Sequence, residues 1–204
     1  IPFVNTFTVF LTTLGLISAR AQVCYGNLNV KFGGAYCGMS DALDGASHHA
    51  TEDIAFMRAL PNMKVIAPAD AAAARWATKY AVENYGPMYL RLSREVYPDL
   101  YTEDTRFELG KGAIVRDGSD VTVIACGIMV HKALEAAKIL EERLISVRVV
   151  DMYSIKPIDR ELIVKCAEET GAIVCAEEHN IHGGLGSAVS EVLAYEGCGV
   201  PTEF

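Results

Sequence analysis

The chain has 204 residues, of which 51% are hydrophobic and 22% are charged, so it can form one large domain or two modest ones. Its formal net charge of −8 argues against a nucleic acid or an anionic membrane as the main partner. The six cysteines include no C-x-x-C pair, so neither a zinc knuckle nor a redox dithiol is indicated, and a reducing cytoplasm is expected. Polar residues interrupt the apolar opening, residues 1–17, so we expect neither a signal peptide nor a membrane span.

The first half of the sequence predicts strands that alternate with helices, a pattern that indicates right-handed crossovers and a mostly parallel sheet. A Gly33-Gly34 turn is expected after the second strand, and Thr51 and Asp70 are expected to cap the second and third helices. The predicted strands are 1–4, 29–32, 63–67 and 88–92, and the predicted helices are 7–23, 51–60 and 70–85.

Residues 35–50 form a long predicted loop that contains Asp44 and two adjacent histidines, His48 and His49. Loops longer than about 12–15 residues in compact domains are usually functional or disordered, and the flanking apolar segments argue against a linker. Parallel sheets bind ligands beyond the carboxyl ends of their strands, where this loop and the Ser93-Arg94 pair are both expected. We therefore take the loop as the centre of the candidate site.

Charged and turn-forming residues dominate from 95 to 120, which indicates a linker and a domain boundary. A second α/β unit follows, and no convincing element is expected after its last helix. The fold class is therefore α/β with two domains, each a mostly parallel sheet flanked by helices, at 1–95 and 119–204 with a linker at 96–118. The strands of the second domain are predicted at 121–126, 147–150 and 172–176, and its helices at 130–144, 159–170 and 186–195.

Several stretches of the sequence together resemble transketolase. They follow the order and spacing of its carboxyl-terminal half, or of the C-terminal subunit of the split two-chain form, over nearly the whole chain. The resemblance implies a pyrimidine-binding (Pyr) domain truncated at its N-terminus, then a transketolase C-terminal domain that is expected to be incomplete. The stretches are NLNVK at 27–31, LDGASHHA at 43–50, ED at 52–53, MRALPNMKVIAPAD at 57–70, YLRLSR at 89–94 and EEHNIHGGLG at 177–186.

The resemblance implies an enzyme of the pentose phosphate pathway, a transferase that moves a two-carbon ketol unit between sugar phosphates. Its cofactors would be thiamine diphosphate and a divalent metal, Mg or Ca, held by a diphosphate-binding partner and not by this chain. The expected assembly is a homodimer through the Pyr and C-terminal domains, or a heterotetramer with the N-terminal subunit. The family's catalytic glutamate is expected upstream of Ile1, so this chain alone should not turn over.

His48 and Asp44 match the substrate-facing residues of the family's Asp-Gly-x-(Ser/Thr)-His motif. Histidine can relay a proton to or from a sugar oxygen near neutral pH, or it could orient the substrate by hydrogen bonding. A carboxylate suits a polyol because charged acceptors make stronger hydrogen bonds. Two other interpretations stay open: a loop histidine bonded to a backbone carbonyl, and an Asp-Gly pair that only makes a turn.

Arg94 matches the family's phosphate-binding arginine, whose planar guanidinium holds two phosphate oxygens at once; its alternative is a surface salt bridge. Arg91, earlier in the same strand, is expected to point the same way. Phe10, with Phe7 beside it, matches the aromatic pair at the cofactor's aminopyrimidine, although core packing would give the same spacing. Tyr36 stands where many members carry a second histidine, and its phenol can still donate a hydrogen bond to a substrate hydroxyl.

Three further alternatives remain for the whole chain. It could belong to a 1-deoxyxylulose-5-phosphate synthase or to a 2-oxoacid dehydrogenase β subunit, although the Leu-Ser-Arg ending at 92–94 favours transketolase. It could also be a non-catalytic binding or regulatory subunit, which Tyr36 and the missing glutamate would suggest. The glycine run at 183–186 could bind an anion at a helix start, but packing or assembly is the favoured interpretation.

Overall fold

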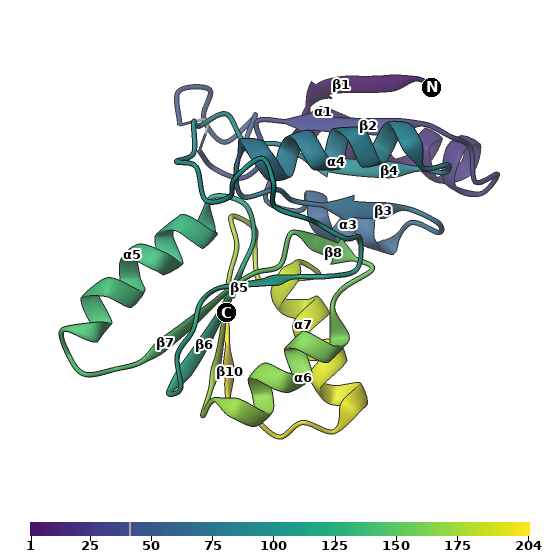
Figure 1. The fold of residues 1–204 in the computed structure, drawn as a ribbon. Coiled ribbons are helices and arrows are strands. Elements are labelled where there is room, and N and C mark those ends of the chain that lie inside the picture. The colour runs from purple at the N-terminus through teal and green to yellow at the C-terminus, as the bar shows by residue number, and fades with distance from the viewer. Residues whose placement is uncertain (41) are drawn as a thin grey trace.

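The structure, a computed structural model, describes residues 1–40 and 42–204. Asp41, which falls in the predicted loop, lies outside the described residues. Two α/β units make up the described chain, each with a five-stranded, mostly parallel sheet flanked by helices (Figure 1). This arrangement confirms the predicted fold class.

The first sheet has its described strands in the order β1-β2-β4-β3-β8. Its first four members are parallel, as predicted, whereas β8 comes from the second half of the chain and runs antiparallel to β3. The carboxyl ends of β1, β2 and β4 therefore meet at one edge of the sheet. The strands are β1 (Phe3–Phe7), β2 (Lys31–Ala35), β3 (Lys64–Ile66), β4 (Met88–Arg91) and β8 (Ser154–Lys156).

Helices α1 (Thr8–Thr13) and α3 (Asp53–Ala59) lie on one face of this sheet, and α4 (Ala71–Glu83) lies on the other (Figure 1). Alternation along the central strand β4 explains the two layers. Tyr89 packs in the same apolar cluster as residues of α1 and α3, whereas Met88, one residue earlier, packs against α4. Both faces of β4 are therefore buried.

The sequence predicts the N-terminal cap of α4 correctly, but not that of α3. Asp70 caps α4 as predicted, because its Oδ1 accepts from the Ala73 amide at 2.8 Å. The Thr51 prediction is wrong: α3 begins at Asp53, and Glu52 occupies the N-cap position without a side-chain capping bond. The Glu52 carboxylate instead accepts from the Thr51 amide at 2.7 Å.

The predicted single helix over 7–23 is wrong. The segment contains α1, a short helix α2 (Leu16–Ser18) and a π-helical segment η1 (Ala19–Cys24). Gly15 lies between α1 and α2, where glycine weakens a helix. The Thr12 hydroxyl also donates to the Thr8 carbonyl at 2.8 Å, a bond that bends helices.

The strands predicted at 1–4 and 29–32 both lie further along the chain, as β1 and β2. The predicted Gly33-Gly34 turn is wrong, because both glycines pair inside β2 with β1 and β4. A Cβ on Gly34 would lie 2.7 Å from both the Thr8 hydroxyl and the Tyr89 ring. The glycine is therefore required by close packing between strand and helix, not by a turn.

The second sheet has its described strands in the order β10-β9-β6-β7-β5. All pairs are parallel except β5 with β7. Helix α5 lies on one side of the sheet, and α6 and α7 lie on the other (Figure 1). The elements are β5 (Ala113–Arg116), β6 (Val121–Ala125), α5 (Met129–Glu141), β7 (Val147–Asp151), α6 (Arg160–Glu169), β9 (Ile173–Ala176), α7 (Leu185–Glu196) and β10 (Thr202–Glu203).

Three strands are missing from the sequence-based prediction. β5 lies inside the predicted linker, β8 follows β7 closely, and β10 is the element that the end of the chain was expected to lack. Each is a short strand with a single described neighbour, and such strands carry too few residues for a clear alternation pattern. Asp159, the first residue of the predicted helix 159–170, caps α6, because its Oδ1 accepts from the Leu162 amide at 3.1 Å.

The two units are joined by polar contacts as well as by β8. The Lys156 ammonium donates to the carbonyls of Arg58 and Leu60, at 2.7 and 2.6 Å, at the carboxyl end of α3. Arg58 in turn forms a 2.7 Å ion pair with Glu191 of α7. One apolar cluster contains residues of both units, including Met57 and Ile163. In the part of the chain that the structure describes, no helix combines the length and apolar character that a bilayer span requires.

Candidate functional site

The candidate site lies at the carboxyl edge of the first sheet. Phe7 ends β1, Tyr36 follows β2, and Arg94 follows β4 by three residues. The loop between β2 and α3 brings Asp44 to the same place, as the parallel topology predicts. All six sequence-predicted site residues, which also include Phe10 and His48, belong to one continuous network of ring and charge contacts.

Phe7 is the centre of the ring contacts. Its ring stacks on Tyr36 with centroids 4.5 Å apart and an interplanar angle of 18°. His48 stands edge-on to Phe7 and Phe10, at 5.4 and 5.3 Å. The Phe10 ring is 37% exposed, so an aromatic ligand can reach it. Edge-to-face and stacked pairs of this kind add about 0.5–1.5 kcal/mol beyond area burial.

The charged end of the network is formed by Arg94. Its guanidinium carbon lies 5.3 Å from the centroid of the Tyr36 ring, within the range of a cation–π contact. Its Nη1 lies 3.9 Å from Asp44 Oδ2, and both side chains are about two-fifths exposed, at 42% and 38%. An ion pair this long and exposed is weak.

His48 is held by its own loop. Its amide donates to the Gly45 carbonyl at 3.0 Å, which closes the turn after Asp44. The Ser47 hydroxyl lies 3.0 Å from His48 Nδ1 and restricts rotation of the imidazole. The imidazole is thus fixed against the aromatic rings while the loop brings Asp44 to Arg94.

Tyr36 has a left-handed backbone conformation with a φ of 58°. This region is uncommon for a bulky side chain, and such residues cluster at functional sites because the surrounding structure must hold them there. The amide of the next residue, Cys37, donates to the Leu92 carbonyl at 3.2 Å and keeps the chain close to β4. The turn aims the phenol ring between Phe7 and Arg94.

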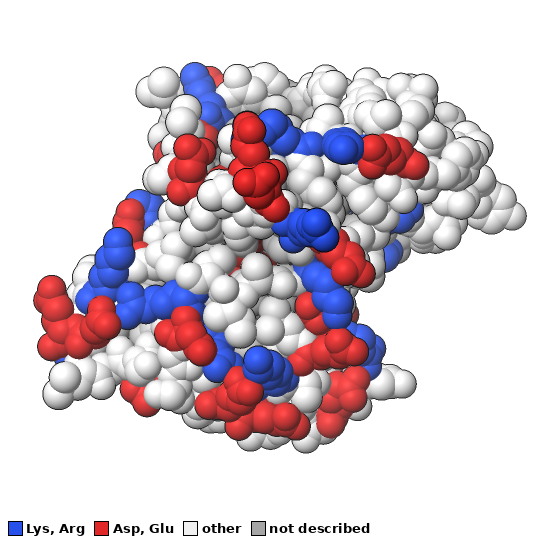
Figure 2. Space-filling model, viewed as in Figure 1, with Lys and Arg blue, Asp and Glu red and all other residues white. Residues whose placement is uncertain are grey.

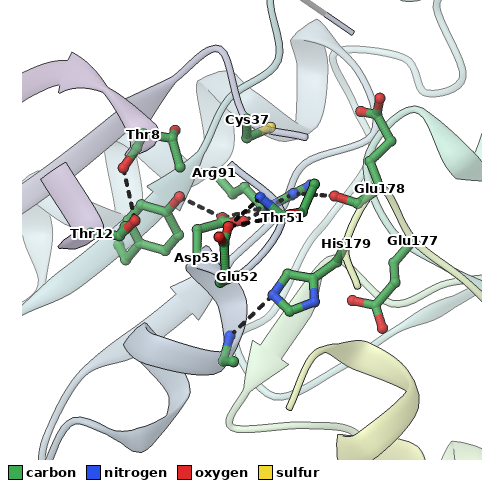
Figure 3. Close-up of polar contacts among 12 residues, drawn as sticks. Thr8, Thr12, Cys37, Thr51, Glu52, Asp53, Arg91, Glu177, Glu178 and His179 are labelled. Carbon is green, nitrogen blue, oxygen red and sulfur yellow. Dashed lines mark hydrogen bonds and ion pairs between the residues drawn. The ribbon is translucent and has the colours of Figure 1, made fainter. Parts of the chain in front are cut away.

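Sequence reasoning missed a buried ion pair beneath the site. The prediction that Arg91 points the same way as Arg94 is wrong. Arg91 is 4% exposed, and its guanidinium donates to both carboxylate oxygens of Asp53, at 2.8 and 3.1 Å (Figure 3). Asp53 also accepts from the Tyr89 hydroxyl at 2.7 Å. This triad fixes the start of α3 against β4, directly after the loop that carries His48.

The second unit contributes Glu178 to this region. Its carbonyl accepts from Arg91 Nη2 at 2.8 Å, and its Oε1 accepts from the Met39 amide at 3.3 Å. Burial raises the pKa of the Glu178 carboxyl, and Arg91 opposes the rise. Burial also raises the pKa of the neighbouring Cys37 thiol to about 12, so this thiol is neutral and is not a nucleophile near neutral pH.

The glycine run at 183–186 is occupied from within the chain. The Glu177 carboxylate accepts from the amides of Leu185 and Gly186, at 2.7 and 2.8 Å, at the first turn of α7. It takes the place that an external anion would occupy, which supports the packing interpretation. Among the residues that the structure describes, no cluster of histidine, cysteine or acidic side chains has the arrangement of a metal site.

Comparison with known proteins matches each of the two units to a known domain family. Residues 1–99 match the sequence model of the transketolase pyrimidine-binding domain, and residues 110–202 match that of the transketolase C-terminal domain. The chain therefore has the pyrimidine-binding and C-terminal domain pair of transketolases. It belongs to the transketolase family and corresponds to the carboxyl-terminal half of its members.

Three relatives illustrate the match. A solved structure described as a split-gene transketolase, an inactive β4 tetramer, is 51% identical with a TM-score of 0.92, and the match covers 100% of this chain and 65% of that one. The 6-deoxy-6-sulfo-D-fructose transketolase subunit of Clostridium sp. (strain MSTE9) is 40% identical over 98% of this chain and 62% of its own length. An apulose-4-phosphate transketolase subunit from Phocaeicola vulgatus is 41% identical over 91% of this chain and 60% of its own length.

The chain spans less than two thirds of the length of these relatives, 60–65%. Their names are those of transketolases or of transketolase subunits, which favours transketolase over the synthase and dehydrogenase alternatives. The comparisons therefore confirm the resemblance inferred from the sequence motifs, both to the transketolase family and to the carboxyl-terminal half of its members.

Proposed function

We propose that this chain forms the C-terminal part of a transketolase that transfers a two-carbon ketol unit from a ketose phosphate to an aldose phosphate. The transfer requires thiamine diphosphate and a diphosphate-binding partner. The observation that carries the proposal is the convergence of Phe7, Phe10, Tyr36, His48, Asp44 and Arg94 on one edge of the Pyr sheet. The combination of an aromatic wall, an imidazole, a carboxylate and a guanidinium suits a phosphorylated polyol beside a flat aromatic cofactor.

The residues present fit the aminopyrimidine end of thiamine diphosphate. The exposed face of Phe10 offers a flat apolar surface, and the buried Thr8 hydroxyl, close to this wall, has no hydrogen-bond partner among the described residues. Phe10, supported by Phe7, would hold the ring. The chemistry that the bound cofactor supplies is the stabilisation of negative charge on a substrate carbon.

The remaining residues act on the sugar phosphate. His48 donates or accepts the proton of a sugar oxygen during carbon–carbon cleavage and formation. Asp44 accepts a hydrogen bond from a sugar hydroxyl, and Tyr36 donates one. Arg94 holds the phosphate group with its planar guanidinium, exchanging its long contact with Asp44 for a stronger charge-assisted one.

The partner completes the site. A diphosphate-binding N-terminal subunit or segment would supply the divalent metal, Mg or Ca, and the remaining cofactor contacts. The surface around β1, α1 and α2 suits such an assembly, because Phe3, Val4, Leu14, Ile17 and Tyr25 are exposed there. The part of Figure 2 over β1 and the N-terminus shows few charged side chains. We propose a homodimer through the Pyr and C-terminal domains, within a heterotetramer.

The wider setting is also part of the proposal. The domains are proposed to divide between residues 95 and 119; the end of this stretch contains β5, which pairs in the second sheet. All six cysteines are free thiols, which is compatible with a reducing cytoplasm, and sugar-phosphate exchange would place the enzyme in the pentose phosphate pathway. The relatives named for sulfofructose and for apulose phosphate indicate that the sugar varies within the family, so we propose the substrate as a class.

The test is reconstitution with the diphosphate-binding partner. The chain is mixed with that partner, thiamine diphosphate and Mg²⁺. Transfer of the ketol unit from a ketopentose phosphate to an aldose phosphate is then measured by product analysis. The chain without its partner is the control and should be inactive. Ketol transfer that depends on both subunits supports the proposal. Condensation of pyruvate with glyceraldehyde phosphate, or an assembly that fails to bind thiamine diphosphate, would overturn it.

A further inference from the structure

The loop that carries Asp44 and His48 is closed at its base by a short antiparallel bridge. The Gly38 amide donates to the Ala50 carbonyl at 2.9 Å, and the Ala50 amide donates back at 3.1 Å. The described residues between 38 and 50 therefore belong to a loop that this bridge closes. The orientation of the loop depends on the contacts that hold the bridge in place. A shift of the bridge therefore also moves His48, because His48 lies two residues before Ala50.

One segment of the second unit, Glu178–Asn180, contacts both arms of this loop. On the incoming arm, Glu178 Oε1 accepts from the Met39 amide at 3.3 Å. On the outgoing arm, the Asn180 amide and its side-chain Nδ2 both donate to the Thr51 carbonyl, at 2.8 and 2.7 Å. The two contacts lie on either side of the Gly38–Ala50 bridge.

Packing at Gly38 shows how closely the loop follows Glu178. A Cβ on Gly38 would lie 2.6 Å from the Glu178 Cβ and 2.7 Å from its Oε2, and the φ of +70° also favours glycine. The Glu178 Oε2 is buried without a hydrogen-bond partner among the described residues. Glu178 therefore packs directly against the backbone of the loop at Gly38.

The buried Arg91 triad anchors the segment itself. Arg91 donates to the Glu178 carbonyl at 2.8 Å while it holds Asp53, and Figure 3 shows Arg91 between Asp53 and Glu178. The neighbouring His179 Nε2 lies 3.4 Å from the Ala55 amide in α3. The segment is therefore fixed relative to β4 and α3 and can hold the loop relative to them.

From these contacts we propose that Glu178 and Asn180 of the C-terminal domain are positioning residues for the substrate loop of the Pyr domain. They act through the Gly38–Ala50 bridge and set where Asp44 and His48 stand relative to Tyr36 and Arg94. The C-terminal domain thereby affects substrate binding without contacting the substrate. The effect on substrate binding rests on the proposed function, whereas the contacts that hold the loop can be tested without an activity assay.

The test uses the complex with the diphosphate-binding partner and three variants. Glu178→Ala removes the acceptor of the Met39 amide, and Glu178→Gln keeps an oxygen there. Asn180→Ala removes the Nδ2 donor to the Thr51 carbonyl, keeps the backbone donor and leaves the Arg91 triad in place. The matched control is Glu191→Ala, which removes a side-chain ion pair between the units, with Arg58, and not a contact to the loop.

Amide hydrogen exchange over residues 37–51 is measured first. Glu178→Ala and Asn180→Ala should each accelerate it about fivefold to tenfold, the size expected when a restraining hydrogen bond is lost. Glu178→Gln should stay close to wild type, and Glu191→Ala should leave the loop unchanged. Unchanged exchange in both alanine variants, or equal acceleration in Glu191→Ala, would overturn the proposal. If the Glu178→Ala variant does not assemble with the partner, the exchange rates of Asn180→Ala alone decide whether the proposal stands.

Steady-state kinetics then separates positioning from a general structural role. The alanine variants should raise KM for the ketose phosphate several-fold more than they lower kcat, with rescue by Glu178→Gln. Unchanged KM and kcat in both alanine variants would contradict positioning, because the loop carries both Asp44 and His48. If the wild-type complex shows no ketol transfer, the proposed function fails while the exchange result still decides the loop contacts.

Discussion

Tyr36 has a central place in the candidate site, although it is the residue at which the sequence departs from the pattern that many transketolases share. Its ring stacks on Phe7, and the guanidinium of Arg94 lies over it. A left-handed backbone at Tyr36 is needed to bring both neighbours to one ring. The phenol ring therefore connects the Phe7–Phe10 pair with Arg94.

At the scale of a single residue we predict the effect of His48→Ala. The imidazole stands edge-on to Phe7 and Phe10, and its loss removes the proton relay that we propose. We expect kcat for ketol transfer to fall about a hundredfold to a thousandfold, the usual contribution of a general acid–base group. Thiamine diphosphate binding, measured by titration of the same assembly, should change little. The adjacent His49→Ala is the control, and an equal loss in both variants would contradict the role of His48.

The linear motifs predict six site residues, and the structure brings all six into one network of contacts. The direction of Arg91 could not be predicted in the same way. Its partner Asp53 is 38 positions away, and a buried ion pair of this kind depends on how a strand and a helix pack. The alternation of a strand cannot relate the direction of Arg94 to that of Arg91, because the strand ends at Arg91.

Helices α4 and α6 are each capped by an aspartate that also accepts hydrogen bonds from the segment between the two units. Asp70 caps α4 with Oδ1, and its Oδ2 accepts from the amides of Leu100 and Tyr101, at 2.9 and 2.8 Å. Asp159 caps α6 with Oδ1 and accepts from the Gly112 amide with Oδ2 at 3.1 Å. Each carboxylate thus fixes a helix and part of the segment that connects the two units.

At the scale of an element, Asp70→Ala should lower the free energy of unfolding by about 2–4 kcal/mol, because it removes a cap and leaves two amides without their acceptor. Asp70→Ser can keep the cap but cannot reach both linker amides. The difference between the two variants should therefore be about 1 kcal/mol in urea unfolding. Equal stability of both variants with wild type would show that the linker contacts contribute nothing.

Long, strongly patterned elements were predictable, whereas the three short strands with a single described neighbour were not. The helices α4, α5, α6 and α7 have clear caps or apolar faces. The missed strands β5, β8 and β10 have two to four residues and become strands only by pairing with a distant neighbour. The break in the first predicted helix likewise depends on Gly15 and on the hydroxyl of Thr12, whose effects the apolar pattern conceals.

At the scale of the whole molecule, a buried carboxyl links the connecting segment to the second sheet. Asp151 at the end of β7 is fully buried, and its Oδ2 accepts from the Tyr101 hydroxyl at 2.9 Å. Burial raises the pKa of Asp151 from 3.8 to about 8; the Tyr101 bond lowers it, and the nearby Asp70 raises it further. The folded chain therefore keeps this carboxyl protonated at pH values where the unfolded chain has lost the proton.

This difference predicts how stability depends on pH. Between the unfolded value near 4 and the folded value of about 8, folding binds an extra proton at Asp151, so its contribution to stability falls as pH rises. The slope is at most about 1.4 kcal/mol per pH unit. Asp151→Asn, which keeps an acceptor for Tyr101, should flatten the dependence in urea unfolding measured at about pH 5 and about pH 8. Identical slopes for variant and wild type would contradict the raised pKa.

The most direct test of the account asks whether the network at the sheet edge binds a sugar phosphate. In the reconstituted complex, Arg94→Ala is compared with wild type for a phosphorylated aldose acceptor and for an unphosphorylated one. Loss of a charge-assisted phosphate contact should raise KM for the phosphorylated acceptor about tenfold or more. KM for the unphosphorylated acceptor should change by less than about twofold, because Arg94 has no phosphate to hold there. An equal change for both acceptors would contradict the phosphate role of Arg94 and, with it, the assignment of this edge as the substrate site.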